Sequence, residues 1–207
     1  GEVIGVGSGS TVAAFLYFLS KRIARENIKV KCVTASIQTK VLARAYGIPV
    51  LEDYSSEFDV AIDGADEVDP SLNLLKGMGG ALTREKLIAQ NSSRYIIICD
   101  SSKLVSRLFS RHPLPIEVIP FLWRITAERA AKACKARSYS IRMLGDVPYT
   151  TDNGNYLIEI HGISMSPDDV LASIKQIAGV VECGVFPNKL VTEVITAHGS
   201  NVTRLSK

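Results

Sequence analysis

The opening stretch Val3-Ile4-Gly5-Val6-Gly7-Ser8-Gly9-Ser10-Thr11 gives the first indication of the fold of this chain. Residues 3–6 predict a short buried strand, and the glycines and hydroxyl residues that follow predict a tight turn into a helix. Apolar residues then recur at helical spacing, at Val12, Phe15, Leu16, Leu19 and Ile23. A strand that passes directly into an amphipathic helix predicts the opening of a β-α-β unit.

Strands and helices go on alternating through the first half of the chain. Apolar runs predict strands at 30–33, 58–62 and 95–99, and helical spacing predicts helices at 37–46 and 82–90. Such short, nearly continuous apolar runs are typical of strands that are buried on both faces. The alternation therefore predicts a parallel sheet with right-handed crossovers.

The pattern changes near His112-Pro113-Leu114-Pro115. The order becomes strand, helix, strand, strand, helix, strand, at 116–119, 126–136, 139–143, 156–160, 167–178 and 180–186, with Ser166 as the expected N-cap of the last helix. This order matches the split β-α-β, ferredoxin-like plan. The runs at 191–195 and 202–205 are expected to return to the first sheet. The predicted fold is α/β: a Rossmann-like parallel sheet flanked by helices (1–113 plus 187–207), with a smaller ferredoxin-like α+β second domain (114–186).

Composition excludes several classes of protein. The 207 residues are 46% hydrophobic and 22% charged, which excludes a disordered, collagen-like or coiled-coil chain. Lys and Arg exceed Asp and Glu by only three, and there is no block of five like charges, so we expect no nucleic-acid partner. Every long apolar run is too short for a membrane span. Four widely spaced cysteines form no CxxC pair and predict a reducing, cytoplasmic location. The chain opens in mid-strand, which suggests that its natural start lies upstream.

The glycine-rich turn at 7–11 follows the first predicted strand. Backbone N–H groups and hydroxyls at the positive end of a helix favour an anion such as phosphate. The alternative is a plain strand-to-helix turn with Ser10 or Thr11 as the N-cap. A dinucleotide site is a weak option, because Ser10 replaces the third glycine of the fingerprint and residues 33–36 lack an acid.

Four acids fall within seven residues at Asp63-Gly64-Ala65-Asp66-Glu67-Val68-Asp69. Like charges so close together repel one another, so they suit a hydroxyl-rich ligand or a cation. A solvated acidic turn is the alternative. A metal site is less favoured, because no histidine lies nearby, although a carboxylate-only Mg²⁺ site stays open.

The most informative stretch is Lys76-Gly77-Met78-Gly79-Gly80-Ala81-Leu82-Thr83-Arg84-Glu85-Lys86. Its glycines let the backbone wrap a ligand while the lysine meets developing negative charge. The lysine precedes the glycines, so this is not a P-loop. Glu85 is either a surface residue that matches the helix dipole or a catalytic carboxylate. Asp100-Ser101-Ser102-Lys103 predicts a capped helix start or a lysine that pairs with phosphate.

Taken in order, these motifs resemble the type A ribose-5-phosphate isomerase family. The stretches that carry the resemblance are 5–11, 63–67, 76–86, 100–103, Pro-Leu-Pro-Ile-Glu-Val-Ile-Pro (113–120) and Thr-Asp-Asn-Gly-Asn (151–155). The resemblance covers essentially the whole chain. It implies an aldose–ketose isomerase of the pentose phosphate pathway that interconverts ribose 5-phosphate and ribulose 5-phosphate through an ene-diolate. It also implies that there is no metal or organic cofactor and that the protein forms a homodimer or homotetramer.

The resemblance also implies roles for individual residues. Glu85 would be the base, Asp63 and Asp66 would bind sugar hydroxyls and assist ring opening, and Lys76 would stabilise the oxyanion. The remaining expected substrate contacts are Ser8, Gly9, Ser10, Thr11, Gly64, Ala65, Gly77, Met78, Gly79 and Lys103. Two features depart from the family: Met78 stands where glycine is usual, and no N-terminal helix precedes the first strand. A sugar-phosphate sensor and a CoA transferase of similar architecture are the rival functions.

Overall fold

The computed structural model describes residues 2–206, which form two compact units. The first unit comprises residues 2–65, 84–101 and 189–206, and the second comprises 66–83 and 102–188. Residues 1 and 207, the outer ends of the predicted first domain, lie outside the described residues. Among the described residues, no helix is long and apolar enough to cross a membrane.

The first unit is built on a six-stranded sheet in the order β15-β14-β6-β3-β1-β2. Five strands are parallel, and only the edge strand β15 runs antiparallel to its neighbour. The strands are β1 (Glu2–Val6), β2 (Val30–Thr34), β3 (Ala61–Asp63), β6 (Tyr95–Asp100), β14 (Glu193–His198) and β15 (Asn201–Ser206). The predicted parallel sheet, and the return of the C-terminal strands to it, are confirmed.

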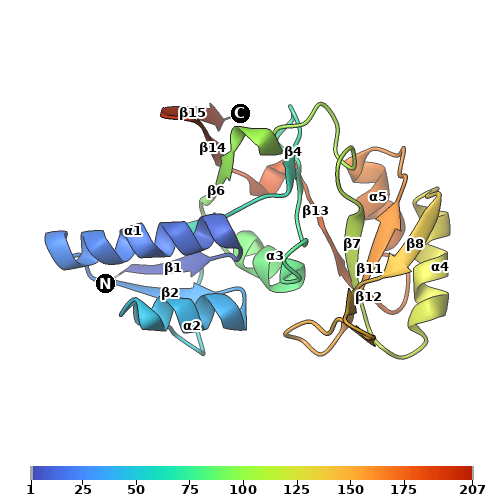
Figure 1. The fold of residues 1–207 in the computed structure, drawn as a ribbon, viewed down its shortest axis with the longest axis horizontal. Coiled ribbons are helices and arrows are strands. Elements are labelled where there is room, and N and C mark those ends of the chain that lie inside the picture. Colours follow the sequence, from blue (N-terminus) through green and yellow to red (C-terminus); the bar gives the residue numbers. More distant parts are fainter. Residues whose placement is uncertain (1, 207) are drawn as a thin grey trace. The chain divides into compact units, whose positions relative to one another are not determined.

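Helices α1 (Ser10–Glu26), α2 (Ile37–Ala45) and α3 (Leu82–Gln90) complete the first unit. Figure 1 shows α1 and α2 running alongside β1 and β2. Successive residues of β1 pack against different helices, because successive side chains of a strand point to opposite faces of the sheet. Ile4 and Val6 share one apolar cluster with buried residues of α1 and α2. Gly5 faces the other way, and a methyl group there would lie 2.4 Å from a side-chain carbon of Ile88 on α3.

The second unit contains a four-stranded antiparallel sheet in the order β12-β7-β11-β8. Its elements are β7 (Leu114–Val118), α4 (Trp123–Ala133), β8 (Ser138–Ile141), β11 (Tyr156–His161), α5 (Pro167–Ile174) and β12 (Val180–Cys183). Helices therefore follow the first and third of these strands, which confirms the predicted ferredoxin-like order. Ser166 caps α5 as predicted, since its hydroxyl accepts the N–H of Asp169 at 3.2 Å.

Smaller elements join the second unit. A three-stranded sheet pairs β4 (Glu67–Val68), β5 (Leu74–Leu75) and β13 (Val185–Phe186) in the order β13-β5-β4, and a hairpin pairs β9 (Met143–Leu144) with β10 (Val147–Pro148). The 3₁₀ turns are η1 (Ser101–Lys103) in both units and η2 (Asn188–Leu190) at a unit border. Segments 66–83 and 102–113 pack in this unit, whereas the sequence places them with the first domain. The limits of independently folding domains stay a prediction.

The predicted strand 180–186 is divided in two at Gly184. Gly184 donates its N–H to the carbonyl of Pro115 and accepts the N–H of Lys76, both at 2.8 Å. The chain thus leaves the sheet of β7 and joins the sheet of β5 within one residue. A Cβ at this position would lie 2.1 Å from the carbonyl oxygen of Lys76, so only glycine fits there.

Candidate active site

The strand order of the first unit fixes where a ligand is expected. After β1 the chain adds β2 on one side, and it later returns to add β3 on the other, so the order reverses at β1. Ligands of open parallel sheets bind outside the carboxyl ends of the strands at such a switch point. The turn 7–11 follows β1, and Asp63 ends β3. Two predicted clusters therefore meet at this edge of the sheet.

Asp63 is buried and accepts hydrogen bonds from Ser8, Gly64 and Tyr95. Its side chain is 1% exposed, and Oδ1 accepts the N–H groups of Gly64 at 2.7 Å and Ser8 at 3.3 Å. Oδ2 accepts the phenol of Tyr95 at 2.8 Å. Donors from three segments of the chain thus fix the carboxylate against the first loop.

Gly7 is required by the position of Asp63. A Cβ on Gly7 would lie 1.9 Å from both Cγ and Oδ1 of Asp63, far closer than any real contact. The φ angle of Gly7 is not in the positive range, so space and not backbone strain dictates the glycine. The absence of a side chain at Gly7 therefore allows the Asp63 carboxylate to contact the backbone of the first loop directly.

Glu85 is a buried carboxylate of α3. It is 3% exposed, and its Oε1 accepts the hydroxyl of Ser8 at 2.6 Å. The alternative of a surface acid that matches the helix dipole is therefore wrong. Ser8 joins the two acids, because its N–H is directed to Asp63 and its Oγ to Glu85.

Tyr95 is a site residue that the sequence analysis missed. It is fully buried at the start of β6, and burial, followed by the nearby charges of Asp63 and Glu85, raises its pKa well above 10. The phenol stays protonated and so remains a donor to Asp63. The sequence did offer a signal for this role, because Tyr95 begins a run of isoleucines that is predicted to be buried. A buried phenol needs a polar partner.

The rest of the first loop lies at the start of α1. The helix begins at Ser10, and its N-cap is Gly9 with φ of +97°, so Ser10 and Thr11 are not the cap. Both side chains are exposed in the first turn, where the leading N–H groups of any helix lack helical acceptors. Gly64 and Ala65 are half-buried directly after β3.

The acidic residues of 66–69, which belong to the second unit, make different contacts. Asp66 accepts the N–H of Met78 on Oδ2 at 3.0 Å. Glu67 is fully buried and accepts the N–H groups of Arg111 and His112, whereas Asp69 accepts those of Ser71 and Asn73 and closes a turn. Glu67 and Asp69 are thus structural. Across residues 2–206, no three His, Cys, Asp or Glu side chains are grouped so that they could hold a metal ion.

Lys76 and the glycines after it form a tight turn in the second unit. Lys76 is 3% exposed, with Nζ 5.5 Å from the ring centre of Phe186. Gly77 and Gly80 have φ of +109° and +84°, and the N–H of Gly80 closes the turn on the carbonyl of Gly77 at 3.0 Å. Gly79 is exposed at the tip. Lys103 ends η1 and is partly exposed.

Met78 and Arg142 lie together at this turn. The Met78 sulfur is 3.8 Å from Nη2 of Arg142, and Nη1 of Arg142 donates to the Met78 carbonyl at 2.9 Å. The methionine side chain therefore packs on Arg142. Sequence analysis missed Arg142 because it falls inside the predicted strand 139–143.

Three motifs of the resemblance, 76–86, 113–120 and 151–155, meet at another buried acid. Glu117 on β7 is fully buried, and its Oε1 accepts from Thr151, Asn153 and Asn155 at 2.8–3.0 Å. Its Oε2 accepts from Thr83, in the first turn of α3. Glu117 thus joins the 151–155 loop to the start of the helix that carries Glu85.

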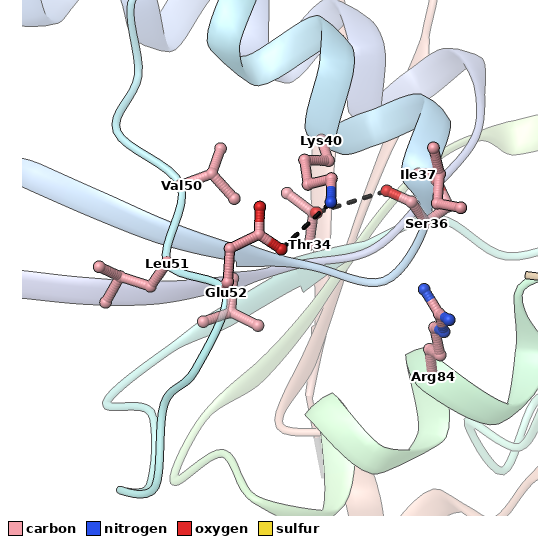
Figure 2. Close-up of a pocket in the computed structure, with 9 residues that line it drawn as sticks. Thr34, Ser36, Ile37, Lys40, Val50, Leu51, Glu52 and Arg84 are labelled. Carbon is pink, nitrogen blue, oxygen red and sulfur yellow. Dashed lines mark hydrogen bonds and ion pairs between the residues drawn. The ribbon is translucent and has the colours of Figure 1, made fainter. Parts of the chain in front are cut away.

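A separate pocket of the first unit lies at the end of β2. It is lined by Val33, Thr34, Ser36, Ile37, Lys40, Val50, Leu51, Glu52 and Arg84. Figure 2 shows Arg84 pointing toward the start of α2, and Lys40 pairs with Glu52 at 3.1 Å. Glu52 supplies the carboxylate that residues 33–36 lack, but Lys40 and Arg44 already pair with it.

A Rossmann-like sheet with two buried carboxylates at its switch point places this chain in the α/β class, with a candidate active site at the edge of the sheet. The family model of ribose 5-phosphate isomerase A (phosphoriboisomerase A) matches residues 31–201. Ribose-5-phosphate isomerase A of Thermoplasma volcanium is 41% identical over 91% of this chain and 78% of its own length.

Solved structures agree with this match. Ribose 5-phosphate isomerase A of Methanocaldococcus jannaschii superposes with a TM-score of 0.91 at 38% identity, covering 100% of this chain and 92% of the other. A D-ribose-5-phosphate isomerase in complex with phospho-erythronic acid gives 0.93 at 39%, covering 100% and 91%. The chain belongs to the ribose 5-phosphate isomerase A family, as its motifs predict.

Proposed function

We propose that this chain interconverts D-ribose 5-phosphate and D-ribulose 5-phosphate by proton transfer through an ene-diolate, with Glu85 as the base. The aldose–ketose isomerase activity rests on membership of the family. The observation that carries the choice of Glu85 is its burial together with the short hydrogen bond from Ser8. A buried carboxylate that is fixed in one orientation suits a base that must reach two neighbouring carbons.

The proposed step balances within the substrate. In the open-chain aldose, Glu85 removes the proton from C2, a C1–C2 double bond forms, and the electrons of the C1 carbonyl move onto its oxygen. The protonated Glu85 then returns a proton to C1, and the proton of the C2 hydroxyl passes to the C1 oxyanion, so that C2 becomes the ketone and C1 becomes a CH₂OH group. No electrons leave the sugar, so the step requires no redox cofactor, and we propose that it requires no metal.

The other predicted residues support this step in the proposal. Asp63 and Asp66 bind sugar hydroxyls and assist ring opening, and Lys76 with the turn of Gly77, Met78 and Gly79 meets the oxyanion charge. The remaining contacts are assigned to Ser8, Gly9, Ser10, Thr11, Gly64, Ala65 and Lys103. One solved relative is a complex with phospho-erythronic acid, whose planar carboxylate carries delocalised negative charge, as an ene-diolate does.

The test is turnover of ribose 5-phosphate by the wild type and by Glu85→Gln, with EDTA present. We expect Glu85→Gln to lose at least about 10³-fold in kcat with KM little changed, because the amide keeps the shape but cannot take a proton. Glu57→Gln, an exposed acid of the same unit, is the control and should turn over normally. Normal kcat in Glu85→Gln would remove the base assignment.

Turnover in deuterium oxide tests the proton transfer itself. A carboxylate that exchanges its proton with solvent should place deuterium at C1 of ribulose 5-phosphate. Complete retention of the substrate hydrogen together with normal turnover in Glu85→Gln would favour a hydride shift and would overturn the ene-diolate. Loss of turnover in EDTA that Mg²⁺ restores would instead revive the metal alternative.

The finer expectations about partners and location are part of the same proposal. We propose a sugar phosphate as the ligand, no nucleic-acid partner, a cytoplasmic location, and assembly as a homodimer or homotetramer. Light scattering at the assay concentration tests the assembly, and a monomer that turns over normally would contradict it.

A further inference from the structure

Arg142 lies outside the sequence motifs, yet its side chain donates hydrogen bonds to the turn at residues 77–80, here called the glycine turn. It lies between β8 and β9, with its side chain 14% exposed. Nη1 donates to the carbonyl of Met78 at 2.9 Å and to that of Gly77 at 3.2 Å. Nε and Nη2 bind one oxygen of Glu159 on β11 at 2.8 and 2.7 Å. One guanidinium therefore ties two successive peptides of the turn to the four-stranded sheet.

Because a peptide group is planar, the contacts of Arg142 with the two carbonyls also fix the directions of the N–H groups of Met78 and Gly79. The described residues contain no cis peptide bond, and in a trans peptide the C=O and N–H point to opposite sides. The Gly77 carbonyl faces Arg142, and the N–H of the same peptide, that of Met78, donates to Asp66 at 3.0 Å. Arg142 and Asp66 thus hold opposite sides of one peptide plane.

The same reasoning applies to the next peptide. The Met78 carbonyl faces Arg142, so the N–H of Gly79 is directed away from it. Gly79 is exposed, and among residues 2–206 its N–H has no hydrogen-bond acceptor. The turn therefore presents one open donor beside the N–H that holds Asp66.

We propose that Arg142 is a positioning residue for the isomerisation: it orients the 77–78 and 78–79 peptides so that Gly79 N–H meets the substrate oxyanion while Asp66 stays fixed. This inference rests on the proposed function. A donor that is aimed before the charge develops lowers the barrier without reorganisation at the moment of reaction.

The site of Arg142 suits arginine and not lysine. A planar guanidinium donates to two carbonyls on one edge and to Glu159 on another, whereas a lysine ammonium is a compact point charge. The guanidinium carbon also lies 5.9 Å from the ring centre of Tyr149, whose hydroxyl lies 2.4 Å from where a Cβ of Gly80 would be. Arg142 and Tyr149 thus brace both ends of the turn.

The test compares Arg142→Lys and Arg142→Gln with the wild type for kcat, KM and the affinity of phospho-erythronic acid. We expect kcat to fall about tenfold to hundredfold, since removal of one oxyanion donor costs up to about 10³-fold. The KM for ribose 5-phosphate should change less than about threefold, and phospho-erythronic acid should bind more weakly by a factor close to the loss in kcat. Arg129→Gln, an exposed arginine of α4, is the control and should match the wild type.

The outcomes separate this inference from the proposed function. Wild-type kcat in Arg142→Lys, or a lower kcat with unchanged affinity for phospho-erythronic acid, would overturn the role of Arg142. Neither result would affect the reaction or the loss expected for Glu85→Gln. If Arg142→Gln does not fold, as judged by its circular dichroism, Arg142→Lys decides the question because it keeps the charge beside Glu159.

Discussion

The hydroxyl of Ser8 donates a 2.6 Å hydrogen bond to Oε1 of Glu85, and the N–H of the same residue points to Oδ1 of Asp63. A single residue of the first loop thus contacts both buried acids of the first unit. Hydrogen bonds to charged groups contribute more than those between neutral groups. We therefore regard Ser8 as an orienting contact for the proposed base as well as a substrate contact.

Ser8→Ala should lower kcat about tenfold, because it removes one orienting bond of the carboxylate and leaves the backbone bond to Asp63 in place. Steady-state kinetics on ribose 5-phosphate measures this loss. Ser20→Ala removes a similar hydroxyl from the exposed face of α1 and should have no effect. An unchanged kcat in Ser8→Ala would show that the rest of the surroundings of Glu85 holds it equally well.

Gly7→Ala should lose activity, and it should also lose stability because the added methyl group overpacks the buried Asp63 carboxylate. The backbone of Gly7 is not strained. The new methyl group would nevertheless displace the Asp63 carboxylate, because its Cβ would lie 1.9 Å from Cγ and Oδ1 of Asp63. We expect kcat/KM to fall at least about hundredfold, because the carboxylate moves away from its donors.

Gly199→Ala differs from Gly7→Ala in its expected effect on activity and serves as the matched control. Its φ is +58° and nothing lies near the added methyl, so it should lose about 1 kcal/mol of stability and keep its activity. Kinetics and urea unfolding of both variants measure the contrast. Full activity in Gly7→Ala would contradict the close packing of Asp63 on the first loop.

Much of the fold follows from local pattern. The buried runs at β1, β2 and β6 and the helix at 82–90 lie where apolar spacing places them, because periodicity reports burial directly. Division of the strand 180–186 could not be foreseen. It depends on Gly184 bonding to Pro115 and Lys76, which are distant in sequence.

Some residues of the candidate site could likewise be predicted from the sequence, whereas others could not. Motifs point to Ser8, Asp63 and Glu85, since polar residues after buried strands collect at one sheet edge. Tyr95 and Arg142 lie within runs that are predicted as strands, where local sequence does not distinguish a polar contact from ordinary strand alternation. Their partners come from other segments, so only the tertiary structure reveals them.

Glu117→Gln should destabilise the protein by about 2 kcal/mol or more. An ionised carboxylate only accepts hydrogen bonds, which suits four donors from Thr83, Thr151, Asn153 and Asn155. A glutamine would direct its own NH₂ at some of them and leave buried donors unpaired. Urea unfolding measures the change. Glu128→Gln on the exposed side of α4 should be neutral, and equal stabilities of the two variants would contradict the arrangement.

Stability should fall as pH rises above about 8.5, because buried thiols keep their protons in the folded state. Burial raises the pKa of Cys32 to about 11, and burial with the neighbouring Cys183 raises that of Cys134 to about 12. Below pH 8.5 both states hold these protons, so the full stability is present. Above it the unfolded chain releases protons that the folded chain retains, and each thiol lowers stability by up to about 1.4 kcal/mol per pH unit.

Urea unfolding of the wild type and Cys134→Ala between pH 8 and 10.5 measures this slope. The variant removes one titrating thiol, so its stability should fall less steeply with pH by up to about 1.4 kcal/mol per unit. Val170→Ala lies in the same apolar core and is destabilised at every pH without a change of slope, which separates packing from titration. Parallel slopes for Cys134→Ala and the wild type would show that the thiol titrates alike in both states.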